Sequence, residues 1–108
     1  MTVDIKPDGD PNRINPASKG VIPVAILSTD TFDATTVDPL SVKFGPDGAT
    51  ETHNKDHIED VNGDGKLDMM LHFQTQETGI ASGDTQACLT GKTTSGLGVT
   101  GCDLIQTV

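Results

Sequence analysis

The stretch DVNGDGKLDMMLHFQ, residues 60–74, joins an acidic, glycine-rich loop to a segment of alternating polarity. From 67 to 73 every second residue is apolar, and a period of two is typical of a half-buried β-strand. A strand is therefore predicted over 67–74. Around the start of the loop, Ile58 and Val61 stand among acidic residues without the spacing of a helix face. The loop is thus predicted to lead into β-structure rather than to join two helices.

The loop itself, residues 60–68, carries oxygen-bearing side chains at its first, third, fifth and ninth positions. Ca²⁺ takes roughly six to eight oxygen ligands, so a short segment supplies them only by wrapping around the ion. Gly65 at the sixth position permits the sharp turn that such wrapping needs. The predicted calcium ligands are Asp60, Asn62 and Asp64 through their side chains, Lys66 through its carbonyl, and Asp68 directly or through a water.

An EF-hand loop would place a bidentate Glu at its twelfth position, which here is Leu71. Together with the strand-like flank, this excludes an EF-hand. The loop instead resembles the DxDxDGxxD calcium loops of dockerins, thrombospondin type 3 repeats and integrin blades, and its expected strand flank is similar to those of the last two. The alternative is an acidic Asn-Gly-Asp-Gly hairpin without a metal.

Composition predicts a single all-β domain over residues 1–108, built as a two-sheet β-sandwich, and the 60–68 loop predicts that this domain binds calcium. The chain has only three aromatic residues, and glycines and prolines interrupt it every few positions. These features favour about seven or eight short strands in an Ig-like or jelly-roll-like arrangement. The most apolar run, Val21–Leu27, is predicted to be a central strand buried on both faces. The net charge of −9 argues against nucleic acid and anionic membranes as partners, and no apolar run is long enough to span a bilayer.

Cys88 and Cys102 lie at equal distances from Ser95, in the middle of a glycine-rich turn. A hairpin centred there places the two cysteines opposite each other, within reach of a disulfide. The alternative is two free, buried thiols. A disulfide indicates an oxidising compartment, and millimolar extracellular calcium would suit a weak Ca²⁺ site.

Two further groups are weaker candidates for metal sites. Asp8, Asp10 and Asn12 have alternate spacing and form either a second calcium site or an acidic turn between two prolines. His53 and His57 form either a zinc site with Asp56 or a pair of exposed loop histidines.

Six segments together resemble an accessory β-sandwich module found in secreted bacterial multidomain proteins. They are VDIKP (3–7), SKGVIPVAIL (18–27), FDATTVDP (32–39), EDVNGDG (59–65), LHFQTQETGI (71–80) and LTG (89–91). The resemblance implies an extracellular, calcium-loop-bearing accessory unit with neighbouring domains in a larger polypeptide.

No catalytic motif such as G-x-S-x-G or H-E-x-x-H is present, so an enzyme is not predicted. The predicted function is a spacer or adhesion unit in which Ca²⁺ stabilises the 60–68 loop. The alternative is a calcium-dependent carbohydrate-binding module for a polysaccharide or cell-surface glycan. Because the chain lacks Trp and Tyr, such a module would contact sugar hydroxyls through polar groups and the ion itself.

Overall fold

The computed structural model describes residues 1–7, 12–52 and 57–108, and nine short strands form three sheets in these ranges. A short α-helix, α1 (Thr75–Thr78), and two 3₁₀ turns, η1 (Ala34–Thr36) and η2 (Pro39–Ser41), lie between strands. In chain order the strands are β1 (Thr2–Ile5), β2 (Arg13–Ile14), β3 (Val21–Leu27), β4 (Lys43–Phe44), β5 (His57–Glu59), β6 (Asp68–Gln74), β7 (Gln86–Lys92), β8 (Gly98–Leu104) and β9 (Gln106–Thr107).

The larger sheet is antiparallel, with strand order β1-β3-β6-β5. Its two central strands, β3 and β6, each contribute three residues to the main hydrophobic cluster. Val24, Ala25 and Ile26 are fully buried in the middle of β3, which confirms the central strand expected there. Strand β6 begins one residue later than predicted, because Leu67 is 56% exposed and belongs to the loop.

Among the helices of the described segments, none has the length and apolarity needed to cross a bilayer.

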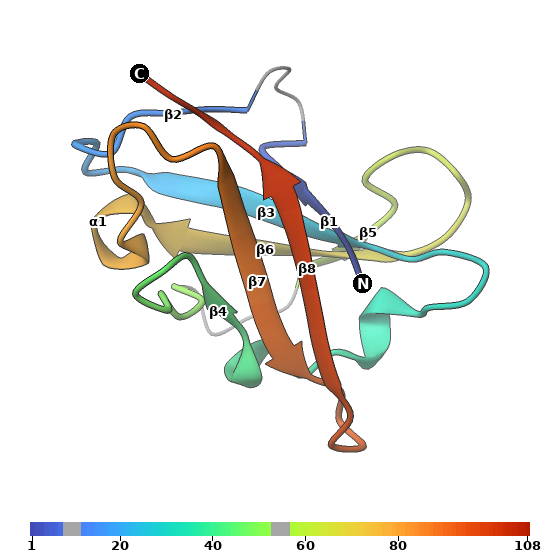
Figure 1. Cartoon of the computed structure of the whole chain (residues 1–108). Helices are drawn as coiled ribbons and strands as arrows, with labels where there is room; N and C mark the ends of the chain where they lie inside the picture. Colours follow the sequence, from blue (N-terminus) through green and yellow to red (C-terminus); the bar gives the residue numbers. More distant parts are fainter. Residues whose placement is uncertain (8–11, 53–56) are drawn as a thin grey trace.

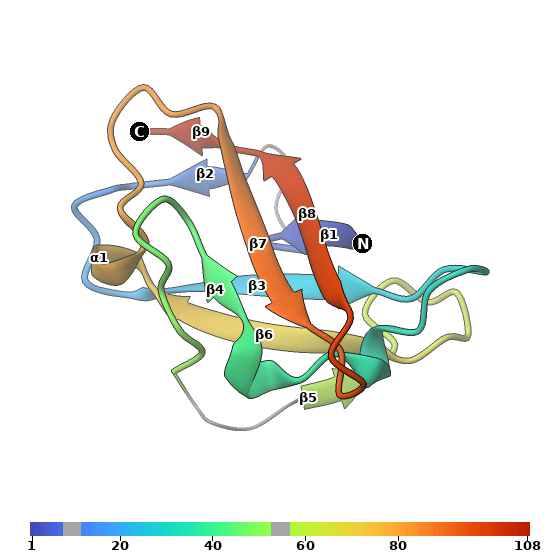
Figure 2. The ribbon, with the colours of Figure 1, turned by 60° about the horizontal axis from the view of Figure 1, so that its bottom comes forward.

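The second sheet has the order β4-β7-β8 and packs across the first. Figures 1 and 2 show β7 and β8 crossing β3 and β6 steeply, which is the orthogonal class of sheet packing. The rings of Phe44, from the second sheet, and Phe73, from the first, lie 5.1 Å apart between the layers, and both are fully buried. The predicted all-β, two-sheet sandwich is therefore confirmed. Strands β2 and β9 add a short parallel ribbon at one end (Figure 2).

Two loops lie side by side at one end of the larger sheet. Because β3 and β6 are antiparallel, the connection that follows Leu27 adjoins the loop that precedes Asp68. Glu59 pairs with Asp68, so residues 60–67 form the hairpin loop between β5 and β6. Figure 1 shows this loop and the connection from β3 to η1 at the same end of the molecule.

Strand β1 crosses β8 so closely that only a glycine fits beneath it. A Cβ atom built on Gly101 would lie 2.7 Å from Cγ2 of Val3 and would also overlap the carbonyl oxygen of Met1. The contact brings the edges of the two sheets together at this point.

Gly101→Ala is expected to lower the free energy of unfolding by about 1–3 kcal/mol, because the added methyl group overpacks this crossing. Gly98→Ala, in the same strand, is the control, because a Cβ there has nothing within 4 Å. Urea denaturation of both variants measures the difference. Equal stabilities would show that the crossing of β1 over β8 is looser than described.

The two cysteines are joined by a disulfide on the outer face of the second sheet. Cys88 pairs with Cys102 in the β7–β8 register, with Cα atoms 4.0 Å apart. Their neighbours Ala87 and Leu89 point into the core, so the disulfide itself is not part of the core packing. The hairpin centre at Ser95 and the cysteine pairing both agree with the sequence-based prediction.

The double variant Cys88→Ala/Cys102→Ala is expected to lose roughly 3 kcal/mol of stability, because the unfolded chain is no longer cross-linked. For a domain of this size the melting temperature would fall by roughly 12–24 °C. Thermal melts of the wild type with and without a thiol reductant should show the same change, while the variant should not respond to reductant. An unchanged melting temperature in the variant would contradict this account.

Candidate metal centre

The carboxylate of Asp60 organises the hairpin loop. Its Oδ1 accepts hydrogen bonds from the backbone N–H groups of Gly63 (2.9 Å) and Asp64 (3.2 Å), and its Oδ2 accepts one from Gly65 (2.9 Å). Gly63 and Gly65 have φ angles of 75° and 83°, a conformation that glycine adopts without strain. The loop therefore wraps around the first of its predicted ligands, as a calcium-binding loop must.

These bonds also affect the ionisation of Asp60. The Gly65 N–H is the largest influence that holds the pKa of the Asp60 carboxyl below its usual value, against a smaller opposing effect of desolvation. The N–H groups of Gly63 and Asp64 act in the same direction as that of Gly65. The loop thus favours the charged form of Asp60, which is the form that binds a cation.

Asp68 lies at the opposite end of the loop and is fully buried. Its Oδ1 accepts a hydrogen bond from the backbone N–H of Ser28 (2.7 Å), and its Oδ2 accepts one from Val61 (2.9 Å). A buried carboxylate is costly unless it is hydrogen-bonded or paired with a cation. Asp68 therefore fixes the start of β6 against both the end of β3 and the beginning of the loop.

The loop brings three carboxylates together. One oxygen from each of Asp60, Asp64 and Asp68 lies within 4.8 Å of the other two. In the described part of the chain no Lys or Arg forms an ion pair with them, and the nearby Lys66 ammonium lies 3.1 Å from Asp30 Oδ1 instead. Like charges at this separation repel, more strongly where burial of Asp68 lowers the local dielectric. The group can hold a metal ion, which would relieve that repulsion.

The other predicted ligands lie in the same loop, and their roles as ligands stay predictions. Asn62 Oδ1 accepts a hydrogen bond from the Asp64 N–H at 3.4 Å, and the Lys66 N–H donates to Asp64 Oδ1 at 2.9 Å. At the twelfth position Leu71 is fully buried in β6, so further oxygens would have to come from water or a ligand.

The weaker candidate sites fall mostly outside the described residues. Asp8 and Asp10 of the second calcium site lie there, as do His53 and Asp56 of the zinc alternative and the side chain of His57. Asn12 is described, and its side-chain amide donates to Asp103 Oδ2 (2.9 Å) and to the Leu104 carbonyl (2.8 Å). That amide therefore joins the start of β2 to the end of β8.

Sequence reasoning missed Ser28. Its N–H donates to Asp68, its Oγ donates to the Leu67 carbonyl (2.6 Å), and the same Oγ accepts from the Ala34 N–H (2.8 Å). A single serine after an apolar run has no recognisable motif, and its two partners in the loop, Leu67 and Asp68, lie about 40 residues away. Only the position of Ser28 directly after the predicted central strand could have drawn attention to it.

No model of a known protein family, curated protein sequence or solved structure matches the chain. The resemblance to secreted bacterial modules therefore stays an expectation from the sequence. The candidate metal site rests on the convergence of its three carboxylates.

In the metal-free protein, the amide signals of Gly63 and Gly65 are expected to titrate with Asp60 at a midpoint below about 3.9, the usual Asp value. The pKa of Asp60 is lower in the folded state than in the unfolded chain. The ionised Asp60 therefore stabilises the folded state at pH values above the unfolded-chain pKa, and this stabilisation is lost as the pH falls through the folded-state pKa. NMR titration in EDTA measures this midpoint. Asp60→Asn should abolish the transition, and a wild-type midpoint at or above 3.9 would contradict the described hydrogen bonds.

Proposed function

We propose that the chain is a non-catalytic, extracellular, calcium-binding accessory module of a larger secreted protein. Ca²⁺ would stabilise the 60–68 loop, with Asp60, Asn62, Asp64, the Lys66 carbonyl and Asp68 as its ligands. The observation that carries this proposal is the convergence of three carboxylates, from positions one, five and nine of the loop, within 4.8 Å.

The ligand chemistry supports calcium over other metals. The loop offers carboxylate, amide and carbonyl oxygens, which are the ligands of hard cations, and no thiol or imidazole. Asp60, Asn62 and Asp64 are exposed, which leaves room for water in the coordination shell. Ca²⁺ tolerates such irregular, partly hydrated sites better than Mg²⁺, which demands near-octahedral geometry.

The disulfide supports an extracellular setting. Disulfides persist in oxidising compartments, where small domains often depend on them for stability. Calcium sites in extracellular modules typically bind with dissociation constants of about 10⁻⁴–10⁻³ M, so an open site would still be filled outside the cell.

A spacer or adhesion role fits the place of the loop in the fold. Asp68 contacts both the loop and the end of β3, so an ion held there would stiffen the end of the larger sheet. This module would act through its rigidity, between neighbouring domains of the same polypeptide.

Calcium at 100 times its dissociation constant is expected to stabilise the wild type by about 2.7 kcal/mol. This corresponds to a rise of roughly 10–20 °C in melting temperature for a domain of this size. Asp64→Asn keeps an oxygen acceptor for the Lys66 N–H but removes the charge, so it should lose most of the rise. Thermal melts in CaCl₂ and in EDTA, with calorimetric titration of Ca²⁺, measure both effects.

The matched control is Asp84→Asn. Asp84 also accepts a backbone N–H of its own turn, from Ala81 at 2.9 Å, but lies outside the cluster. This variant should respond to calcium as the wild type does. Absence of a calcium effect on the wild type, or a full effect on Asp64→Asn, would refute the proposed site.

A further inference from the structure

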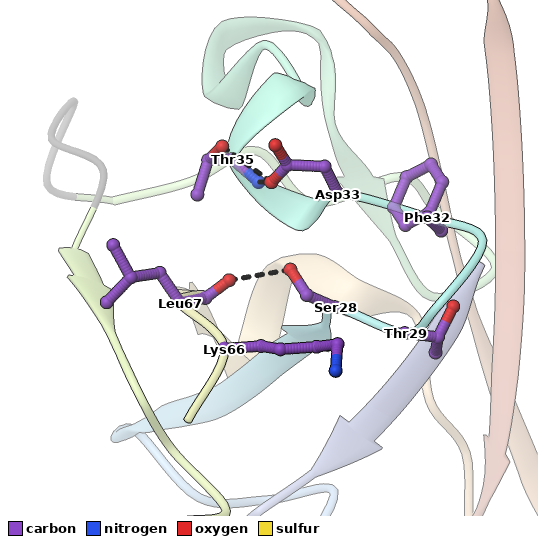
Figure 3. Close-up of a pocket in the computed structure, with 7 residues that line it drawn as sticks. All are labelled: Ser28, Thr29, Phe32, Asp33, Thr35, Lys66 and Leu67. Atoms are coloured by element: carbon purple, nitrogen blue, oxygen red, sulfur yellow. Dashed lines mark hydrogen bonds between the residues drawn. The ribbon is translucent and has the colours of Figure 1, made fainter. Parts of the chain in front are cut away.

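A pocket lies beside the hairpin loop, between the connection that follows β3 and the last residues of the loop (Figure 3). Its volume of about 310 Å³ is at the lower end of the roughly 300–1,000 Å³ typical of small-molecule sites. At about 30 Å³ per water molecule it has the space of roughly ten waters, which is enough for a pyranose ring with its hydroxyl groups.

The walls of the pocket are held in place by hydrogen bonds. Ser28 Oγ joins the Leu67 carbonyl on the loop side to the Ala34 N–H on the η1 side. Thr29 and Phe32 exchange backbone hydrogen bonds of 2.8 and 3.4 Å across a tight turn. The pocket is therefore formed before any ligand arrives, which reduces the entropic cost of binding.

Two opposite charges line the pocket. Asp33 Oδ1 accepts hydrogen bonds from the N–H (3.0 Å) and the hydroxyl (2.6 Å) of Thr35, while Oδ2 has no partner in the described part of the chain. The Thr35 hydroxyl, and secondarily its N–H, hold the pKa of Asp33 below its usual value, so the carboxylate is charged at neutral pH. Lys66 uses one of its three N–H donors on Asp30 and keeps two for a ligand.

Phe32 supplies the apolar part of the lining. It is partly buried and packs against the core, whereas the other two aromatic residues, Phe44 and Phe73, are fully buried. It is thus the one aromatic ring of the chain that also borders open space, and it does so in this pocket.

We propose that this pocket binds one ring of a neutral saccharide. The Asp33 carboxylate disfavours anions and the Lys66 ammonium disfavours cations, so the lining suits an uncharged ligand with many hydrogen-bonding groups. Sugar hydroxyls both donate and accept, and they match the carboxylate, the ammonium and the hydroxyls of Thr29 and Thr35. The C–H face of a pyranose ring would lie on Phe32. This goes beyond the proposed calcium-binding role, since sugar contacts come from the pocket and not from the ion.

The test is an NMR titration of the ¹⁵N-labelled chain in CaCl₂ with gluco-, galacto-, manno- and xylo-oligosaccharides and their methyl glycosides. Methyl glucuronide serves as the anionic counterpart. At least one neutral sugar is expected to shift the amides of 28–35 and 66–67, while methyl glucuronide should leave them unchanged. An affinity that rises with the length of the oligosaccharide would identify a polysaccharide as the ligand. An equal affinity for methyl glycosides would identify a free sugar or a chain end as the ligand. Both outcomes support the inference.

Two aspartates provide a matched pair of variants. Asp33 and Asp38 cap η1 and η2 in the same way, each accepting a backbone N–H two residues on at 3.0 Å, but only Asp33 lines the pocket. Asparagine preserves both caps. Asp33→Asn is expected to weaken saccharide binding at least about tenfold, and Asp38→Asn less than about twofold. Phe32→Leu, which keeps an apolar side chain against the core, should also weaken binding.

The inference is overturned if no neutral sugar shifts these amides, or if Asp33→Asn binds as tightly as Asp38→Asn. The amides of Gly63 and Gly65 report Ca²⁺ independently in the same samples. A chain that binds Ca²⁺ but no sugar would overturn this inference alone, whereas one that binds sugar without Ca²⁺ would support it and overturn only the calcium proposal.

Discussion

The buried carboxylate of Asp68 is the constraint on which this end of the molecule depends. It lies fully inside the protein, and its burial is compensated by the backbone N–H groups of Ser28 and Val61, which donate to its two oxygens. Those two bonds fix the end of β3, the start of the loop and the start of β6 relative to one another. The geometry of both the metal loop and the neighbouring pocket follows from this arrangement, since each borders Ser28 or Asp68.

The sequence predicted those parts of the fold that local periodicity determines. Val21–Leu27 is long and apolar enough to be recognised as a central strand, and the alternation after residue 67 identified β6. The β7–β8 hairpin followed from the symmetry of Cys88 and Cys102 about Ser95. The strand Arg13–Ile14 was not predictable, because it is defined by a partner more than ninety residues away and carries no period of its own. The steep crossing of the sheets likewise depends on close approaches such as that at Gly101.

The candidate site shows the same division between local and long-range information. Alternate spacing correctly predicted that the carboxylates of Asp60, Asp64 and Asp68 converge, because a loop with glycines in the left-handed conformation must turn around them. The spacing could not show that Asp68 is buried while the other two are exposed. It also treated Lys66 only as a source of a carbonyl, whereas its side chain pairs with Asp30 and lines a pocket. These features arise from contacts between the β3–η1 connection and the loop, which lie far apart in sequence.

The disulfide also has a mechanical consequence. In a protein built of modules, tension passes along the backbone from one domain to the next. Because Cys88 and Cys102 are covalently joined, force would pass from one to the other through the sulfur atoms and bypass the turn between them. Residues 89–101 would contribute no length when the domain unravels. At about 3.5 Å per residue, roughly 45 Å of contour would be withheld from extension. Tension would therefore unfold the crossing sheets but leave residues 88–102 as a closed loop. When the tension is released, strands β7 and β8 would pair again from this loop.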